Sequence, residues 1–295
     1  MNGLIKETDK FMDKVAYIYD LISRPCSNER IEFLYGILSE NGKNVFCDLS
    51  CSTGETIRNL SEKCNNRMIG IDFSKGMINI CKKKNLENKN TDFIKCDMRD
   101  LSKINDKIDV MYTNSINWNQ SIEDIRKVFI ETKKTLEREG CFIVDIPNSN
   151  QFLLTPYPTY SNKYIDDRYI IIKTTQYLDK DKTDNNGTLK MLQNYLIIDK
   201  NVNMQYSYSH LLKIIDLGID QIIQIGNECD FEVEYIKYNY LSSEVSENTN
   251  SIQIIFKKAK LEEEIYIKEI KPEMTQCRII QVDKKIKESN DEISI

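Results

Sequence analysis

Short runs of β-branched and apolar residues alternate with helical patterns between residues 43 and 146. Parallel strands need a long crossover connection, which is usually a helix, so this alternation predicts a doubly wound α/β fold with a parallel sheet. The predicted strands are Asn44–Leu49, Arg67–Ile71, Asp92–Lys95, Ile108–Thr113 and Cys141–Ile146. The predicted helices between them are Glu55–Lys63, Lys75–Lys84 and Ile122–Leu136.

The pattern changes after Pro147. Three long segments rich in β-branched and aromatic residues follow, and Asn185-Asn186-Gly187 has the composition of a hairpin turn. We therefore predict an antiparallel β insertion with strands at Tyr169–Tyr177, Thr188–Asp199 and Met204–Ile215. After it, the α/β pattern resumes with a helix at Gly218–Cys229 and strands at Phe231–Tyr238 and Ser251–Lys257.

These patterns divide the chain into four parts. Apolar residues at helical spacing within residues 10–40 predict two helices with a break near Pro25. The tail after residue 258 is charged, and we expect it to be partly flexible. The predicted parts are N-terminal helices (1–42), the α/β core (43–148 and 211–258), the β insertion or lid (149–210) and the C-terminal extension (259–295).

Composition narrows the classes of function. The formal net charge is −5, so the chain has no general attraction for phosphate backbones and a nucleic-acid partner is unexpected. The nine cysteines include no C-x-x-C pair, and we interpret them as reduced thiols of a cytoplasmic protein. With His210 as the single histidine, we expect neither a metal site nor a histidine-based triad. No apolar run approaches 18 residues and the N-terminal segment lacks an apolar core, so we expect neither a membrane span nor a signal peptide.

Two acidic strand ends carry the first chemical signal. In VFCDLSCSTGE (residues 45–55), a strand ends at Asp48 and a loop of small residues leads to a helix, where a ligand can approach the backbone closely. In MIGIDFSKGM (residues 68–77), Asp72 closes the next strand, where an acid can accept both hydroxyls of an adenosine ribose. A plain βα turn is the simpler interpretation of the first segment. A helix N-cap is the simpler one for Asp72, although Ser74 is able to cap in its place.

Two further strand ends complete the set. In FIKCDMRDL (residues 93–101), Asp97 can accept from an adenine amine while Met98 packs on the ring, unless Asp97 is a solvated loop acid. In IDVMYTNSINW (residues 108–118), a strand delivers Asn114 at its carboxyl end, where open α/β sheets bind ligands.

Together, in this order and spacing, the four segments resemble the motifs of class I S-adenosylmethionine-dependent methyltransferases. The resemblance covers roughly residues 10–258, and TNSINW with LEREGCFIVDIPN (residues 136–148) is similar to the small-molecule subgroup that includes glycine, sarcosine and amino-sugar N-methyltransferases. It implies a Rossmann-like, seven-stranded mixed sheet, S-adenosylmethionine as cofactor and a small-molecule acceptor, with nitrogen favoured over oxygen.

The resemblance also implies roles for individual residues. Asn114 would lie near the methyl-bearing sulfonium, and Tyr19 would close the site from the N-terminal helix, unless it is a core tyrosine. Cofactor-binding residues would be Asp48, Ser50, Cys51, Ser52 and Gly54 around the methionine part, Asp72 on the ribose, and Phe73, Asp97 and Met98 around the adenine.

Ser50 and Ser52 depart from the glycines that the family often has in this loop, which leaves a non-catalytic S-adenosylmethionine-binding protein as an alternative. A methyltransferase acting on RNA or protein is a second alternative. A nicotinamide-dependent oxidoreductase is disfavoured, because G-x-G-x-x-G is absent.

Overall fold

The computed structural model describes residues 3–23, 25–40, 42–84, 89–119, 121–148, 159–180, 188–259, 265–267 and 282–284. The chain divides into two compact units, residues 1–258 and 259–295. Within the second unit, β12 (Ile265–Ile267) and β13 (Val282–Lys284) form an antiparallel pair. The site lies in the first unit, to which the rest of this description is confined.

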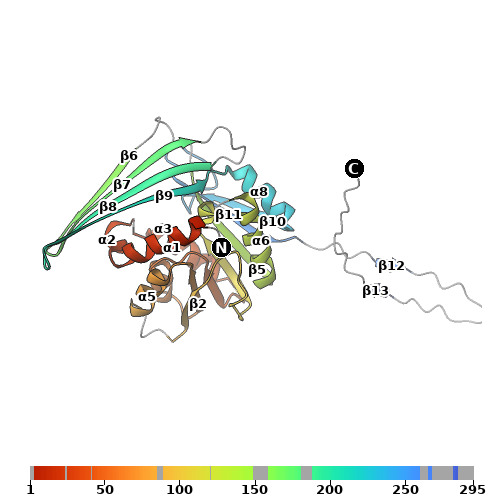
Figure 1. Ribbon diagram of the computed structural model, residues 1–295. Helices are drawn as coiled ribbons and strands as arrows, with labels where there is room; N and C mark the ends of the chain where they lie inside the picture. Colours follow the sequence, from red (N-terminus) through yellow and green to blue (C-terminus); the bar gives the residue numbers. More distant parts are fainter. Residues whose placement is uncertain are drawn as a thin grey trace, which may run out of the picture. The chain divides into compact units, whose positions relative to one another are not determined.

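A seven-stranded sheet forms the centre of the first unit (Figure 1). Its strands are β1 (Val45–Asp48), β2 (Arg67–Asp72), β3 (Thr91–Lys95), β4 (Ile108–Thr113), β5 (Leu136–Pro147), β10 (Phe231–Tyr238) and β11 (Ser251–Lys258). The strand order is β10-β11-β5-β4-β1-β2-β3, in which β11 runs antiparallel to both of its neighbours. The mixed seven-stranded sheet that we predicted is therefore confirmed.

Helices cover both faces of this sheet, as in a doubly wound fold. One face packs its apolar side chains against α6 (Ile122–Thr135) and α8 (Ile219–Glu228). The other packs against α3 (Asn28–Leu38), α4 (Glu55–Ser61) and α5 (Lys75–Lys84). Because both faces are covered, the central strands are buried almost throughout, which explains their near-continuous apolar sequences.

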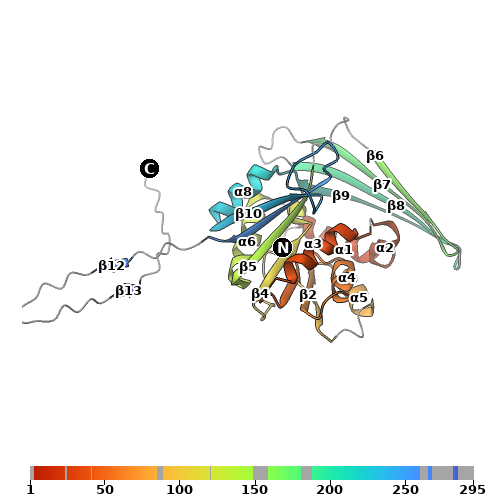
Figure 2. The same cartoon turned by 180° about the vertical axis from the view of Figure 1, so that it is seen from behind.

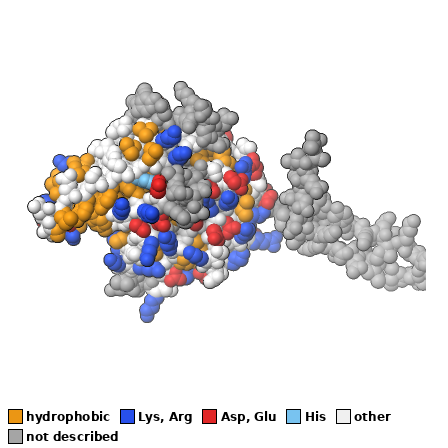
Figure 3. Space-filling model, viewed as in Figure 1, with side chains coloured by type: hydrophobic (Ala, Val, Ile, Leu, Met, Phe, Trp, Pro, Cys, Tyr) orange, Lys and Arg blue, Asp and Glu red, His pale blue; other side chains and the backbone are white. Residues whose placement is uncertain are grey.

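A second, four-stranded antiparallel sheet is formed by the insertion (Figures 1 and 2). Its strands, in spatial order, are β6 (Thr159–Ile165), β7 (Tyr169–Lys180), β8 (Thr188–Asp199) and β9 (Met204–Ile215). β9 continues beyond residue 210, where we placed the end of the insertion. The predicted turn at residues 185–187 lies outside the described residues. Hydrophobic side chains gather over the part of this sheet that lies at the left of Figure 3.

The N-terminal segment packs against the inner face of the four-stranded sheet. It consists of α1 (Gly3–Val15), η1 (Ala16–Ile18) and α2 (Tyr19–Ile22), and α3 follows after the predicted break. Apolar residues of α1, η1 and α2 form one core cluster with Ile171, Tyr195 and Ile197 of the sheet. The N-terminal helices thus fill the space beneath the insertion.

Two sequence predictions differ from the structure. β5 begins at Leu136 and not at Cys141, and its charged first residues 137–139 are exposed, so their sequence lacks the apolar signal of a strand. The strand β6 was not predicted, because six of its seven side chains are exposed and its polar sequence TYSNKYI is that of an edge strand.

Candidate active site

The strand order reverses at β1, which lies between β2 and β4. Ligands of open α/β sheets bind outside the carboxyl ends of the strands at such a switch point. The chain leaves β1 through the loop Leu49–Gly54, and it leaves β4 at Asn114. The topology therefore brings these two predicted segments to the same edge of the sheet.

The loop after β1 has two residues in the left-handed region, Ser52 with φ 49° and Gly54 with φ 82°. Gly54 begins helix α4, and a Cβ at this position would lie 3.0 Å from the ring of Phe93. Cys51 is buried and its Sγ lies 4.0 Å from Sγ of Cys81. Gly54 and Cys51 thus pack against the protein interior and set the conformation of the loop. Neither lines the pocket described below.

Asp48 also lies beneath the loop, contrary to our expectation that it faces the cofactor pocket. Its Oδ1 accepts a hydrogen bond of 3.0 Å from the backbone N–H of Ser50. The side chain is 3 % exposed, and burial raises its pKa to about 7. Because the carboxylate accepts from the backbone of the loop that follows it, Asp48 holds this loop in place.

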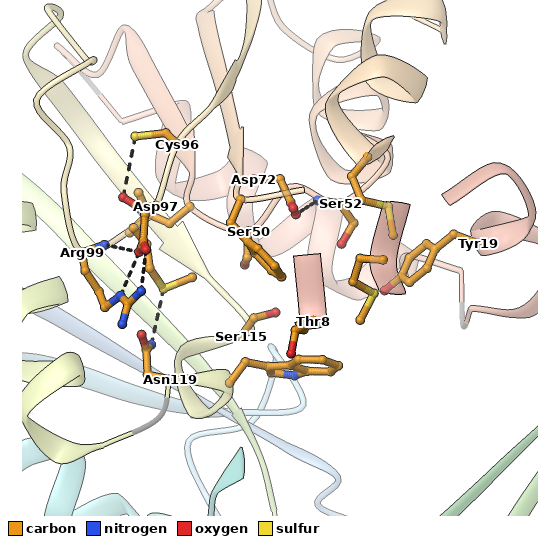
Figure 4. A pocket seen from close by; sticks show the side chains of 16 residues that line it. Thr8, Tyr19, Ser50, Ser52, Asp72, Cys96, Asp97, Arg99, Ser115 and Asn119 are labelled. Carbon is orange, nitrogen blue, oxygen red and sulfur yellow. Dashed lines mark hydrogen bonds and ion pairs between the residues drawn. The ribbon is translucent and has the colours of Figure 1, made fainter. Parts of the chain in front are cut away.

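Asp72 closes β2 and faces the pocket (Figure 4). Its two oxygens accept backbone hydrogen bonds from Ser52 (3.0 Å) and Ser74 (2.8 Å). Burial raises its pKa to about 7, although both N–H groups act in the opposite direction. Ser74 caps α5 by accepting from the N–H of Met77, so the capping role does not fall to Asp72. Each carboxylate oxygen has a second lone pair and can still accept from a ligand hydroxyl.

Asp97 follows β3 and is held by an arginine that the sequence analysis missed. Arg99 donates to both carboxylate oxygens of Asp97 and also forms an ion pair with Asp124 of α6, 3.1 Å away. Burial acts to raise the pKa of Asp97, but the hydrogen bonds from Arg99 outweigh it and hold the pKa below its usual value. Asp97 therefore stays charged, and Arg99 fixes its position at the pocket wall.

A first pocket opens over these strand ends (Figure 4). Seven of the predicted residues line it, namely Tyr19, Ser50, Ser52, Asp72, Phe73, Asp97 and Met98. Its volume is about 120 Å³, which is small compared with the roughly 300–1,000 Å³ of typical ligand pockets. Met12 and Tyr19 of the N-terminal segment form part of the wall, so this segment narrows the pocket.

Tyr19 lines the first pocket beside Ser52, and burial raises the pKa of its hydroxyl, so the side chain is a neutral phenol. This position fits its predicted role in closing the site. By contrast, His210 packs away from both cavities: its Nε2 lies 3.0 Å from Oγ1 of Thr8, and its ring stacks on Phe11.

A second, larger cavity of about 800 Å³ lies between the sheet edge and the inner face of the four-stranded sheet. Asn114 lines this cavity and not the first pocket. Its Oδ1 accepts a 3.2 Å hydrogen bond from Oγ of Ser50, which lines the first pocket. Trp118 lines both. The two cavities therefore adjoin at Ser50, Asn114 and Trp118.

A buried polar network forms one wall of the second cavity. Asp145, near the end of β5, accepts hydrogen bonds from the hydroxyls of Tyr112 (2.9 Å) and Tyr240 (2.6 Å) and from the amide of Gln253 (2.9 Å). Arg30 of α3 donates to the hydroxyl of Tyr240. Burial raises the pKa of Asp145, and its carboxylate is satisfied by these three hydrogen bonds and by Arg30, whose Nε lies 3.9 Å away. The network joins α3, β4, β5 and β11 into one rigid wall.

Comparisons with known proteins agree with this geometry. Residues 46–140 match the family model described as a methyltransferase domain. A search of curated proteins by sequence found no match. The chain shares the fold of solved methyltransferases at low sequence identity.

One of them is a S-adenosylmethionine-dependent methyltransferase from Clostridium acetobutylicum, with 20 % identity and a TM-score of 0.68 over 84 % of this chain and 99 % of that one. Another is the sugar N-methyltransferase KedS8 from a Streptoalloteichus species, with 12 % identity and a TM-score of 0.63 over 79 % and 88 %. A third is the amino pentose methyltransferase CalS10 from Micromonospora echinaspora, solved with S-adenosylmethionine bound, with 10 % identity and a TM-score of 0.57 over 88 % and 98 %. The predicted fold is confirmed, and residues 46–140 within it are similar to a methyltransferase domain.

Proposed function

We propose that this protein transfers the methyl group of S-adenosylmethionine to a small molecule, and that an amine is the acceptor. The cofactor would occupy the first pocket and the acceptor the second cavity. The observation that carries the proposal is the hydrogen bond between Ser50 and Asn114, because it lies where the two cavities adjoin. A methyl group passing between two ligands has to cross at such a point.

The residues of the first pocket fit the cofactor. Asp72 is a buried carboxylate with lone pairs left for two ribose hydroxyls. Leu49, Phe73 and Met98 offer apolar surface for an adenine ring, beside the fixed carboxylate of Asp97. The methionines in the wall are unbranched and adaptable, so they can move aside to widen the narrow pocket.

The proposed reaction requires little acid–base catalysis by residues of the protein. Bound S-adenosylmethionine supplies an activated methyl group on a positively charged sulfur. The chain's own residues then have to align the lone pair of an uncharged amine behind that methyl, and positioning of this kind supplies roughly 7–11 kcal/mol. Asn114, held by Ser50 and by Oγ of Ser115, is placed to orient the acceptor with its side-chain amide. The volume of about 800 Å³ suits a small molecule.

Other features support a small acceptor. The sequence carries a net charge of −5, which gives no general attraction for RNA. KedS8 and CalS10 are named for sugar and amino pentose substrates, which makes amino sugars a suitable first panel for this chain. The eight described cysteines are free thiols, in line with the predicted reducing cytoplasm. The described helices contain none that is long and apolar enough to cross a membrane.

Replacing Asn114 with alanine is expected to lower kcat by about 10-fold or more, because a misplaced acceptor loses much of the benefit of alignment. S-adenosylmethionine affinity should change by less than about 3-fold, since Asn114 does not line the first pocket. Turnover with an amino-sugar panel and calorimetric titration of the cofactor measure the two effects. A fall in cofactor affinity with unchanged kcat would show that Asn114 belongs to the cofactor site.

Cofactor affinity should depend on pH because the pKa of Asp72 is raised to about 7. Ribose hydroxyls donate to the ionised carboxylate, so binding favours the deprotonated form. We therefore expect affinity about 10-fold weaker at pH 6 than at pH 8, with a plateau above pH 8. Asp48 has a similarly raised pKa but lies beneath the loop, so Asp72→Asn should remove most of the dependence. Equal slopes in wild type and D72N would assign the titration to another group.

A further inference from the structure

The inner face of the four-stranded sheet forms one wall of the acceptor cavity. Side chains of a strand alternate between its two faces, so residues 173, 175 and 177 of β7 share the face that lines the cavity. Lys173 is the one charged side chain that β6–β9 contribute to this lining within the described part of the chain. The other contributors are apolar or neutral, namely Thr175, Tyr177, Leu189, Met191, Gln193, Ile214 and Ile215.

Lys173 has no counter-charge among the residues that the structure describes. Its Nζ lies 5.5 Å from the centroid of the Tyr195 ring, and no carboxylate among the described residues approaches it within 4.0 Å. Arg168, in the turn that precedes β7, has an ion pair of 3.0 Å with Asp199. Burial lowers the pKa of Lys173, because the ammonium group loses hydration and no anion compensates for that loss.

The acids that line the cavity come from other elements. Asp145 is already engaged by Tyr112, Tyr240 and Gln253. Glu29 of α3 and Asp216 after β9 also line the cavity, but neither forms an ion pair with Lys173. The cavity thus presents Lys173 on the insertion sheet, and on other elements it presents acids together with Arg30, which donates to Tyr240 and lies 3.9 Å from Asp145.

We propose that Lys173 selects methyl acceptors that carry an anionic group, a carboxylate or a phosphate, and binds that group inside the second cavity. The inference rests on the proposed function, because it assigns the acceptor to this cavity. A partly buried ammonium whose one recorded contact is an aromatic ring lacks an anion, and a ligand anion supplies the missing charge. Glu29, an acid at the cavity wall, favours an acceptor whose other end is an amine, so the structure assigns an amine that also bears an anion.

The test compares probes with and without an anionic group on protein saturated with S-adenosylhomocysteine. The probes with an anion are glucosamine 6-phosphate and 4-aminobutyrate, and their counterparts without one are glucosamine and 4-aminobutyramide. We expect at least one probe with an anion to bind wild type at least about 10-fold more tightly than its counterpart, and Lys173→Met to remove this preference. Lys173→Arg should retain part of it. Comparing the two anions distinguishes phosphate from carboxylate recognition.

Lys213→Met is the matched control, because Lys213 is an exposed lysine of β9. It should bind the probes as wild type does. K173M should melt at or above the wild-type temperature, since methionine replaces an unpaired charge with a side chain of similar length, and this checks that the variant folds. No saturable binding of either probe with an anion, or equal binding by K173M and wild type, overturns the inference. Loss of turnover in K173M with unchanged probe affinity also overturns it and makes Lys173 a base. Failure of S-adenosylmethionine itself to bind wild type would instead contradict the proposed function.

Discussion

Replacing Asp72 with asparagine is expected to weaken S-adenosylmethionine binding by about 10-fold or more. Two ribose hydroxyls would donate to this carboxylate, and a hydrogen bond to a charged group contributes about 1.5–3 kcal/mol. Asparagine keeps the shape of the side chain and one acceptor oxygen, so it can still accept from Ser52 or Ser74 but not from both. The loss of affinity therefore measures mainly the contribution of the negative charge of Asp72 and of its second acceptor oxygen.

Calorimetric titration of wild type, Asp72→Asn and Asp92→Asn measures this effect. Asp92 is an exposed acid on β3, paired with Arg67, and it does not line the first pocket, so D92N should bind as wild type does. Denaturant unfolding of both variants separates a loss of binding from a loss of folding. Equal affinity of D72N and wild type would mean that the ribose lies elsewhere.

Replacing Phe129 with alanine is expected to destabilise the protein by about 3–5 kcal/mol, the usual cost of truncating a buried phenylalanine. Phe129 lies on α6, is fully buried, and packs edge-to-face on three other phenylalanines. The ring centroids lie 5.2 Å from Phe142, 5.6 Å from Phe231 and 5.3 Å from Phe256. These three rings come from β5, β10 and β11, so the substitution removes the contact that joins the helix to three strands.

Ile130→Ala is the matched control for this prediction. Ile130 is the next residue of the same helix and is 42 % exposed, so its truncation should change the free energy of unfolding by no more than about 0.5 kcal/mol. Urea unfolding followed by circular dichroism measures both variants. A loss below about 1 kcal/mol for F129A would show that the cluster repacks around the cavity.

The fold was predictable because the apolar pattern of each central strand is set by burial on two sides. β1, β2 and β4 match their predicted ranges to within two residues, since their burial is nearly continuous and leaves a strong signal. The signal is lost where a strand is exposed. The first residues of β5 and the whole of β6 are polar or charged because water, and not the core, faces them.

The site was predictable only where a backbone position fixes a side chain. Asp72 closes β2 and Asp97 follows the end of β3, so their place at the sheet edge follows from the strands themselves. Asp48 also closes a strand, yet its carboxylate turns under the loop, a choice of rotamer and partner that the sequence does not encode locally. Arg99 and Lys173 have no local signal, because their roles depend on Asp124 of a distant helix and on a cavity enclosed by other elements.

A crystal structure of the protein with S-adenosylhomocysteine tests the central claim most directly. We predict that the ribose hydroxyls lie within about 3.2 Å of the Asp72 carboxylate and that the sulfur faces the Ser50–Asn114 contact, toward the second cavity. A nucleoside bound away from Asp72, or a sulfur directed away from that cavity, would contradict the account.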